Sequence, residues 1–329
     1  MGLFKRRKDG GGAGGRLRLY YASDIHGTEV LWRKFLQAPA VYKAPVIVMG
    51  GDVTGKVVIP LVQENGEVVA ELFGQPERAG TPEEVAELEN RIRANGMYPH
   101  LMAPGEVQRV AALTVEEREA WFAEVMLVTF ERWMSLAGER LADPEVRCFV
   151  MPGNDDPAGV DEAIESAERV EACDGRVVDL GGGYTMISLG YSNITPFDSP
   201  RELEEDELFR RVEAMAGQVE DLSHCVFNLH VPPYASQLDT AAELDEDLNV
   251  VLAAGEPKMI PVGSTAVREA IERFQPIAAL HGHVHESRGV TRIGRSLCIN
   301  PGSDYHTGRI SGALVHLRGD HADYQFVVG

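Results

Sequence analysis

The residues of this chain best suited to bind metal are acidic, histidine and asparagine side chains that follow short apolar runs. They occur in five motifs: Ser-Asp-Ile-His-Gly, Gly-Gly-Asp-Val-Thr-Gly, Pro-Gly-Asn-Asp-Asp, Asn-Leu-His-Val-Pro-Pro and His-Gly-His-Val-His. The candidate ligands in these motifs are Asp24, His26, Asp52, Asn154, His230, His283 and His285. Nitrogen and oxygen donors without cysteine suit two divalent ions such as Mn, Fe or Zn.

One of these residues is expected to be shared between the two ions. A carboxylate has two oxygens and a negative charge, so it can bridge two cations, and Asp52 is the natural bridge. Glycines flank the candidate ligands, as at Gly51 and Gly153. Because glycine tolerates tight backbone turns, we expect these glycines to aim the side chains at a common point.

The elements that must position these residues are short buried strands with helices between them. Apolar runs that end in turn-forming residues predict strands at 17–22, 46–49, 147–151, 184–189, 225–229, 277–280 and 296–299. Helical patterns lie at 29–35, 160–170, 204–218 and 265–274. This alternation predicts an α/β fold, in which ligands bind outside the carboxyl ends of the strands. A terminal hairpin is expected from 312–317 and 322–328.

A long segment interrupts this alternation between residues 56 and 144. It begins with a candidate hairpin turned at Asn65 and Gly66, and helix-start patterns follow at Thr81 and Thr114. The second start leads a long amphipathic run. We interpret 56–144 as a mainly helical insertion in a domain at 16–329, after a flexible tail at 1–15. The insertion is expected to act as a lid that sets substrate choice, although its apolar face could equally make a homo-oligomer interface.

Composition restricts the partners and the compartment. The chain carries 31 basic and 51 acidic residues, a net charge of −20, which argues against broad nucleic-acid binding and favours metal cations. The four cysteines are scattered and predict core thiols in a reducing cytoplasm. No apolar run approaches the roughly 20 residues that span a bilayer. The basic start leads into glycines where a secretory signal has an apolar region, so we expect a cytoplasmic protein without a membrane partner.

Taken in order, the five motifs resemble those of the calcineurin-like metallophosphoesterase superfamily. The resemblance runs from residue 16 to about residue 304, apart from the insertion. The segment Asn300-Pro301-Gly302-Ser303 is similar to one found in the small bacterial and archaeal branch of that superfamily. The resemblance implies a four-layer αββα sandwich, which agrees with the alternation of strands and helices.

The resemblance also implies a division of the ligands and a reaction. Asp24, His26 and His285 would hold one ion. Asn154, His230 and His283 would hold the other, with Asp52 between the two. The implied reaction is hydrolysis of a small phosphodiester or nucleotide by in-line attack of a metal-bound hydroxide, without a covalent enzyme intermediate. The residues expected to carry catalysis are Asp52, Asn154, Asp155 and His230.

One position departs from the family pattern. Many members have histidine directly after the Gly-Asn asparagine, where this chain has Asp155 followed by Asp156. An aspartate is ordinarily ionised at neutral pH and cannot protonate a leaving oxygen. This favours diesters or activated leaving groups over alkyl monoesters. A plainer alternative is that Asp155 and Asp156 only orient the metal ligands.

Two other functions stay open at this point. A metal-dependent nuclease shares these motifs, but the acidic composition and the missing histidine count against it. A binding scaffold that keeps the fold without catalysis is the second alternative. Such relatives are expected to lose metal ligands, and here all seven are present.

Overall fold

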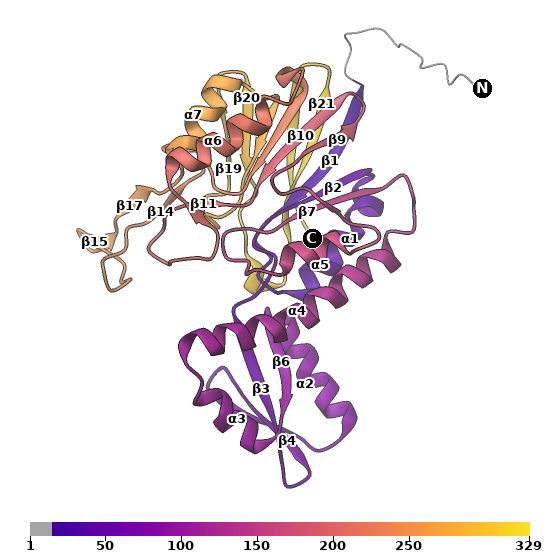
Figure 1. The fold of residues 1–329 in the computed structure, drawn as a ribbon, viewed down its shortest axis with the longest axis vertical. Coiled ribbons are helices and arrows are strands. Elements are labelled where there is room, and N and C mark those ends of the chain that lie inside the picture. Colours follow the sequence, from indigo (N-terminus) through magenta and orange to yellow (C-terminus); the bar gives the residue numbers. More distant parts are fainter. Residues whose placement is uncertain (1–14) are drawn as a thin grey trace.

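The computed structural model describes residues 15–329, so the tail predicted for 1–15 lies outside the described residues except for Gly15. Two six-stranded sheets pack face to face, and helices cover the outer face of each (Figure 1). One apolar cluster lies between the sheets, and one lies under each helical layer. The α/β class and the four-layer αββα arrangement expected from the sequence are confirmed.

The first sheet joins the two ends of the described chain. Its strand order is β22-β21-β1-β2-β7-β8. The strands are β1 (Arg16–Ala22), β2 (Val46–Gly50), β7 (Arg147–Met151), β8 (Glu171–Ala172), β21 (Ser311–Arg318) and β22 (His321–Val328). Strands β1, β2, β7 and β8 run parallel, whereas the predicted terminal hairpin β21–β22 adds antiparallel to β1.

The second sheet is built from the later part of the chain, with the order β19-β20-β18-β13-β10-β9. Its strands are β9 (Val177–Gly181), β10 (Tyr184–Leu189), β13 (Cys225–Leu229), β18 (Ala278–Leu280), β19 (Gly289–Ile293) and β20 (Ser296–Asn300). The central four run parallel, and each edge strand is antiparallel. The carboxyl ends of the parallel strands therefore meet at one edge of each sheet.

The alternation of side chains in β1 explains why its second half, Leu19 to Ala22, is apolar at every position. Leu19 and Tyr21 belong to the cluster between the sheets, whereas Tyr20 and Ala22 belong to the cluster under the helices. Successive strand side chains point to opposite faces, so a strand covered on both faces needs apolar residues at every position. All four of these residues are buried.

The helices divide between the two outer faces. The cluster on the first sheet contains residues of α1 (Glu29–Tyr42), α4 (Val115–Arg140) and α5 (Val160–Glu165), and that on the second contains residues of α6 (Glu205–Ala216) and α7 (Thr265–Phe274). Trp32 of α1 stacks on Trp133 of α4 with ring centroids 5.9 Å apart. Within residues 15–329, no helix has both the length and the apolar character that crossing a membrane requires.

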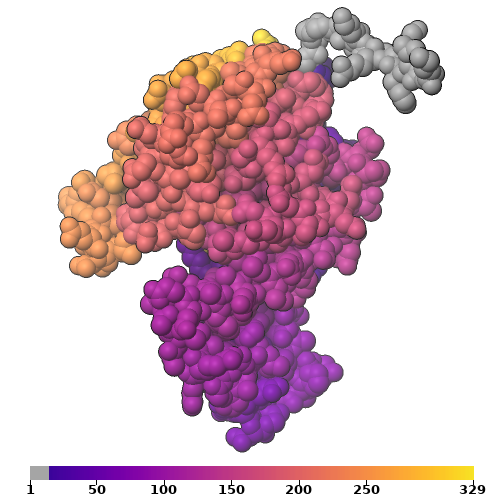
Figure 2. All heavy atoms as spheres, viewed as in Figure 1, coloured from indigo at the N-terminus to yellow at the C-terminus, as the bar shows by residue number. Residues whose placement is uncertain are grey.

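The segment 56–144 forms a lobe that projects from the two sheets (Figures 1 and 2). It contains four strands as well as helices, in the order β5-β4-β3-β6. Its elements before α4 are β3 (Val57–Glu64), β4 (Glu67–Leu72), β5 (Gln75–Ala79), α2 (Pro82–Ala94), β6 (Met97–Met102) and α3 (Pro104–Ala111). Both predicted helix starts are present, because Thr81 and Thr114 each form a capping box. The lobe has a small apolar core of its own.

Helix α4 connects this lobe to the main body. Its later residues Met126, Phe130 and Trp133 are buried in the cluster on the first sheet. The helix is therefore part of the main core and not only of the insertion. The remaining short elements are β11 (Ser192–Asn193), β12 (Glu202–Leu203), β14 (Thr240–Ala242), β15 (Leu252–Ala253), β16 (Glu256–Pro257), β17 (Met259–Pro261), η1 (Leu222–His224) and η2 (Tyr305–Thr307).

Candidate metal centre

Each predicted ligand lies in a loop directly after a parallel strand. The loops after β1 and β2 carry Asp24, His26 and Asp52, and the loop after β7 carries Asn154. His230 follows β13, and the last two histidines follow β18. Backbone hydrogen bonds join the first two loops, from Asp24 N to Gly51 O at 3.0 Å and from His26 N to Asp52 O at 3.0 Å. Both sheets thus contribute side chains to one place.

Four of the seven predicted ligands have left-handed backbone conformations. The φ angles are 57° at Asp24, 39° at His26, 50° at Asp52 and 65° at His283. Positive φ is uncommon for residues with a side chain, because Cβ crowds the backbone, and it costs roughly 1–2 kcal/mol per residue. Such conformations cluster at functional sites, where the surrounding structure holds them in place. The backbone here is arranged to aim side chains at the expense of local stability.

The first group of donors contains Asp24, His26, Asp52 and His285, whose candidate ligand atoms all lie within 4.8 Å of one another. The Nε2 atoms of His26 and His285 are 3.0 Å apart. His285 Nε2 lies 3.5 Å from Asp24 Oδ1, and His26 Nε2 lies 3.8 Å from Asp52 Oδ2. A single ion could contact all four side chains.

The second group contains Asp52, His230 and His283, again with candidate ligand atoms within 4.8 Å. Asn154 joins it through Oδ1, which lies 3.0 Å from His230 Nε2 and 2.7 Å from His283 Nδ1. Asp52 Oδ2 is 3.4 Å from His230 Nε2. Asp52 therefore takes part in both groups, and the structure brings all seven predicted residues together.

Asn154 and His283 are each preceded by a glycine at a position that has no room for a side chain. A Cβ atom on Gly153 would overlap the carboxylate of Asp52, and one on Gly282 would overlap that of Asp24. Neither glycine has a positive φ angle. The sequence analysis expected glycines such as Gly153 to permit tight turns. At Gly153 the physical reason is the close approach of a neighbouring carboxylate.

Charge in the centre is balanced between buried carboxylates and histidines. Burial opposes ionisation of Asp52, but the charge of His230 outweighs it and holds the pKa of Asp52 well below its usual range. Burial likewise disfavours the cation of His230, yet Asp52 and Asp24 raise the pKa of His230 to about 10. Burial lowers the pKa of His283 to about 4, so that its imidazole is neutral at pH 7. The buried carboxylates of Asp24 and Asp52 thus stabilise a positive charge placed beside them.

The chemistry of the donors fits divalent metal ions. Asp24 and Asp52 are buried carboxylates, and a buried carboxylate needs a compensating cation. A divalent ion held by these residues would meet this need in place of the proton on His230, because ligands bind metal in their deprotonated forms. The donors are nitrogen and oxygen atoms only, which suits Mn, Fe or Zn and gives no preference among them.

Asp156 has a positioning role. Its side chain is fully buried, and it accepts hydrogen bonds from the backbone N–H groups of Val53 (3.0 Å), Thr54 (2.8 Å) and Gly153 (2.7 Å). Burial, followed by the charge of Asp52, raises the pKa of Asp156 to about 6. These contacts hold the loop that carries Asp52, as an aspartate that orients metal ligands would do.

Asp155 lies at the rim of the centre. Its Oδ2 is 2.5 Å from Lys56 Nζ, and its Oδ1 accepts a hydrogen bond from Ser199 Oγ at 2.8 Å. Its backbone N–H donates to Asp52 Oδ1 at 3.0 Å. Asp155 therefore contacts a shared ligand through its backbone, while its side chain faces a cation and a hydroxyl.

The sequence analysis missed several residues around the centre. The Tyr305 ring centroid lies 4.7 Å from that of His26 and 5.8 Å from that of His285. Ser303 Oγ donates to Asp24 O at 2.6 Å, and Asn300 Nδ2 donates to Val284 O at 2.9 Å. The Asn-Pro-Gly-Ser segment was the available signal, since it holds the loops of Asp24 and His283. No motif marked Lys56 or Tyr305.

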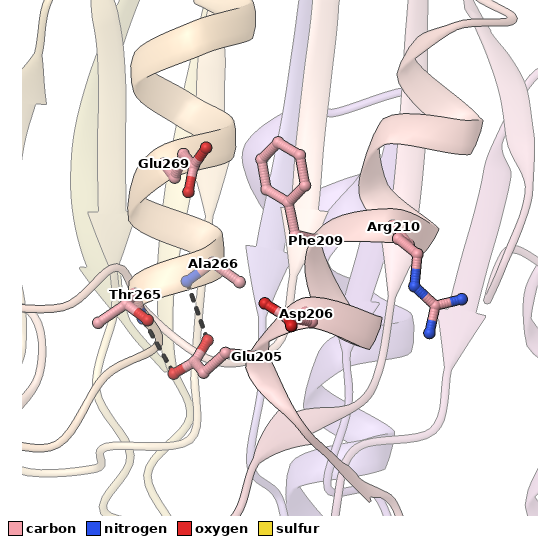
Figure 3. Close-up of a pocket in the computed structure, with 7 residues that line it drawn as sticks. All are labelled: Glu205, Asp206, Phe209, Arg210, Thr265, Ala266 and Glu269. Atoms are coloured by element: carbon pink, nitrogen blue, oxygen red, sulfur yellow. Dashed lines mark hydrogen bonds between the residues drawn. The ribbon is translucent and has the colours of Figure 1, made fainter.

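A separate hollow of about 400 Å³ lies between α6 and α7 (Figure 3). Glu205 in its wall accepts hydrogen bonds from the backbone N–H groups of Thr265 (3.1 Å) and Ala266 (2.9 Å). None of the seven predicted ligands lines this hollow. Asp206 and Glu269 add further negative charge to it, which disfavours phosphate esters. It is not part of the metal centre.

Comparisons with known proteins agree with this architecture. No family model matches the chain. The uncharacterized protein MJ1162 of Methanocaldococcus jannaschii is 30% identical over 159 residues, which are 48% of this chain and 63% of that protein. The similarity thus spans about half of this chain and less than two thirds of the relative. One solved structure, 16% identical, has a TM-score of 0.54 and covers 95% of this chain and 98% of its own.

A dimetal phosphatase from Danio rerio is also similar, with 8% identity, a TM-score of 0.42, and 94% and 98% of the two chains covered. The solved structure with the TM-score of 0.54 shares the fold of this chain over nearly its whole length. The six carboxylate and histidine side chains of the two groups, together with Asn154, could hold divalent metal ions.

Proposed function

We propose that this chain is a dinuclear-metal phosphoesterase that hydrolyses a small phosphodiester or nucleotide. The observation that carries the proposal is the position of Asp52. Its Oδ2 atom lies 3.8 Å from His26 Nε2 in one donor group and 3.4 Å from His230 Nε2 in the other. A carboxylate shared between two groups is the arrangement that two neighbouring cations need.

In this proposal each donor group holds one ion. Asp24, His26 and His285 bind the first, and Asn154, His230 and His283 bind the second, with Asp52 between them. Divalent ions at these positions supply positive charge that activates water and neutralises phosphoryl oxygens. The protein holds the donors still through buried hydrogen bonds, such as that between His230 Nδ1 and Gly50 O at 2.8 Å.

The surroundings of Asp155 support a diester over an alkyl monoester. Both carboxylate oxygens already act as acceptors, one beside Lys56 and one from Ser199. A carboxylate used in this way cannot protonate a leaving oxygen. Its negative charge also repels the dianion of a monoester more than the monoanion of a diester.

The proposal is tested by hydrolysis of bis(p-nitrophenyl) phosphate and p-nitrophenyl phosphate, with the protein stripped of metal and then supplied with Mn²⁺. We expect turnover that depends on Mn²⁺ and a higher kcat/KM for the diester. A higher value for the monoester would contradict the diester assignment. Bound metal without turnover of either ester would instead favour a binding scaffold.

We further propose that the insertion sets substrate choice. It begins four residues after Asp52, and it returns to the centre where Tyr98 accepts a hydrogen bond from Gly55 N at 2.7 Å. Replacing residues 57–113 with a short glycine-serine linker should leave α4 in the main core. We expect the diester-to-monoester ratio to change while metal content, measured by elemental analysis, stays the same. Loss of both metals would count against a lid.

A further inference from the structure

A cation lies at the rim of the candidate metal centre, on the first residue of the insertion. Lys56 Nζ is 2.5 Å from Asp155 Oδ2. The Lys56 side chain is 60% exposed, whereas that of Asp155 is 13% exposed. The ammonium therefore reaches solvent at the rim, while its partner is largely covered.

The carboxylate that this ammonium contacts is held beside the donors. Asp155 directly follows Asn154 and receives a second contact from Asn154 Nδ2 at 3.3 Å. Ser199 Oγ holds the same carboxylate at 2.8 Å, and the backbone of Asp155 is bonded to Asp52. Asp155 thus connects Lys56 to Asn154 and Asp52, and so to both donor groups.

The charge pattern makes this lysine unusual. The chain has a net charge of −20, and the centre contains two buried carboxylates. Among the ion pairs of residues 15–329, only this one joins a lysine or arginine to a residue adjacent to a predicted metal ligand. An ammonium has three N–H groups, and one contact with Asp155 leaves others for an anionic ligand.

We propose that Lys56 determines substrate specificity by stabilising the leaving oxygen of the phosphate ester. This inference rests on the proposed phosphoesterase function. Water supplies the oxygen that bonds to phosphorus and loses a proton to solvent. The bond from phosphorus to the ester oxygen breaks, and its electron pair stays on that oxygen beside the Lys56 ammonium. The oxygen then takes a proton from solvent. Lys56 thus stabilises the leaving oxygen, which the ionised Asp155 cannot protonate.

The test compares esters that differ in the quality of the leaving group. Bis(p-nitrophenyl) phosphate releases a stable anion, whereas diphenyl phosphate releases a more basic one and depends more on a cation. Lys56→Gln should lower kcat/KM for diphenyl phosphate by roughly 10-fold to 100-fold more than for bis(p-nitrophenyl) phosphate. Lys56→Arg should retain most of the activity because it keeps the charge. The matched control is Lys258→Gln, an exposed lysine paired with Glu243 on another segment.

A second measurement does not depend on turnover. Inorganic phosphate should raise the melting temperature of the metal-loaded wild type more than that of Lys56→Gln. Asp155→Asn should keep this shift, because it frees the ammonium, whereas a purely structural ion pair would make the two variants behave alike. Equal losses on both diesters, or an unchanged phosphate shift in Lys56→Gln, would overturn the proposal. An inactive wild type would count against the phosphoesterase function, and the phosphate shift would still decide the role of Lys56.

Discussion

Replacing Asp52 with asparagine should abolish metal-dependent turnover and reduce the bound metal. Asp52 takes part in both donor groups, and asparagine lacks the charge and the second anionic oxygen that two cations require. Loss of a residue that merely orients a metal ligand typically costs about 10-fold to 100-fold. Loss of a shared ligand should therefore lower kcat/KM by more than roughly 100-fold. Metal content by elemental analysis and turnover of bis(p-nitrophenyl) phosphate are the measurements.

The matched control is Asp320→Asn, the same chemical change at an exposed turn between β21 and β22. It should leave both metal content and turnover at the level of the wild type. If Asp52→Asn retained two ions and full activity, the bridging role would be wrong. If it retained two ions without activity, Asp52 would act in catalysis and not in metal retention.

Substituting Gly96 by alanine should disturb the metal centre from outside it. Gly96 lies between α2 and β6, where a Cβ atom would stand 2.5 Å from His26 O and 2.9 Å from Thr28 Oγ1. Its φ angle is +74°, which adds strain to any side chain. Overpacking of this kind typically costs about 1–3 kcal/mol, and the clash pushes on the loop that carries His26. We expect weaker Mn²⁺ binding by titration calorimetry and a lower melting temperature.

Gly74 provides the comparison because its φ angle of +72° is nearly the same and nothing lies within 4 Å of a Cβ built there. Gly74→Ala should therefore show only the backbone cost, roughly 1–2 kcal/mol, without a change in metal affinity. Identical behaviour of the two variants would mean that the contact between Gly96 and the His26 loop has no influence on the centre.

Much of the fold was predictable because each parallel strand is covered on both faces. The runs at 46–49 and 225–229 are apolar at nearly every position, and each ends shortly before a polar residue that its strand delivers to the common edge. The hairpin was predictable from its turn residues. Asn65 and Gly66 have φ angles of 52° and 88°, which match the two-residue turn that this pair favours. Local sequence patterns were enough to predict a strand or turn wherever its own residues determine its structure.

The parts that sequence did not reveal depend on contacts between distant residues. Lys56 meets Asp155 across 99 positions, and no local pattern marks either as half of a pair. The insertion is mainly helical, as expected, but β5 and β6 add two strands to its hairpin that the sequence did not indicate. Gln75 to Ala79 is a polar edge strand that lacks the alternation of a half-buried one. Helix α4 was assigned to the lid because its amphipathic pattern predicts an apolar face but does not indicate against which core that face packs.

The pairing of the first strand with the last hairpin has a consequence for the order in which the molecule assembles. Strand β1 finds one neighbour early in β2, but its other neighbour, β21, pairs Leu19 with Val315. The two histidines that meet at 3.0 Å in the centre are 259 residues apart. Long-range contacts form slowly, because the entropy of closing a large loop is lost before any contact compensates for it. During synthesis from the N-terminus, Asp24, His26 and Asp52 leave the ribosome long before His283 and His285 exist. Under the proposed function, the complete set of metal ligands therefore assembles late, after His283 and His285 have been synthesised.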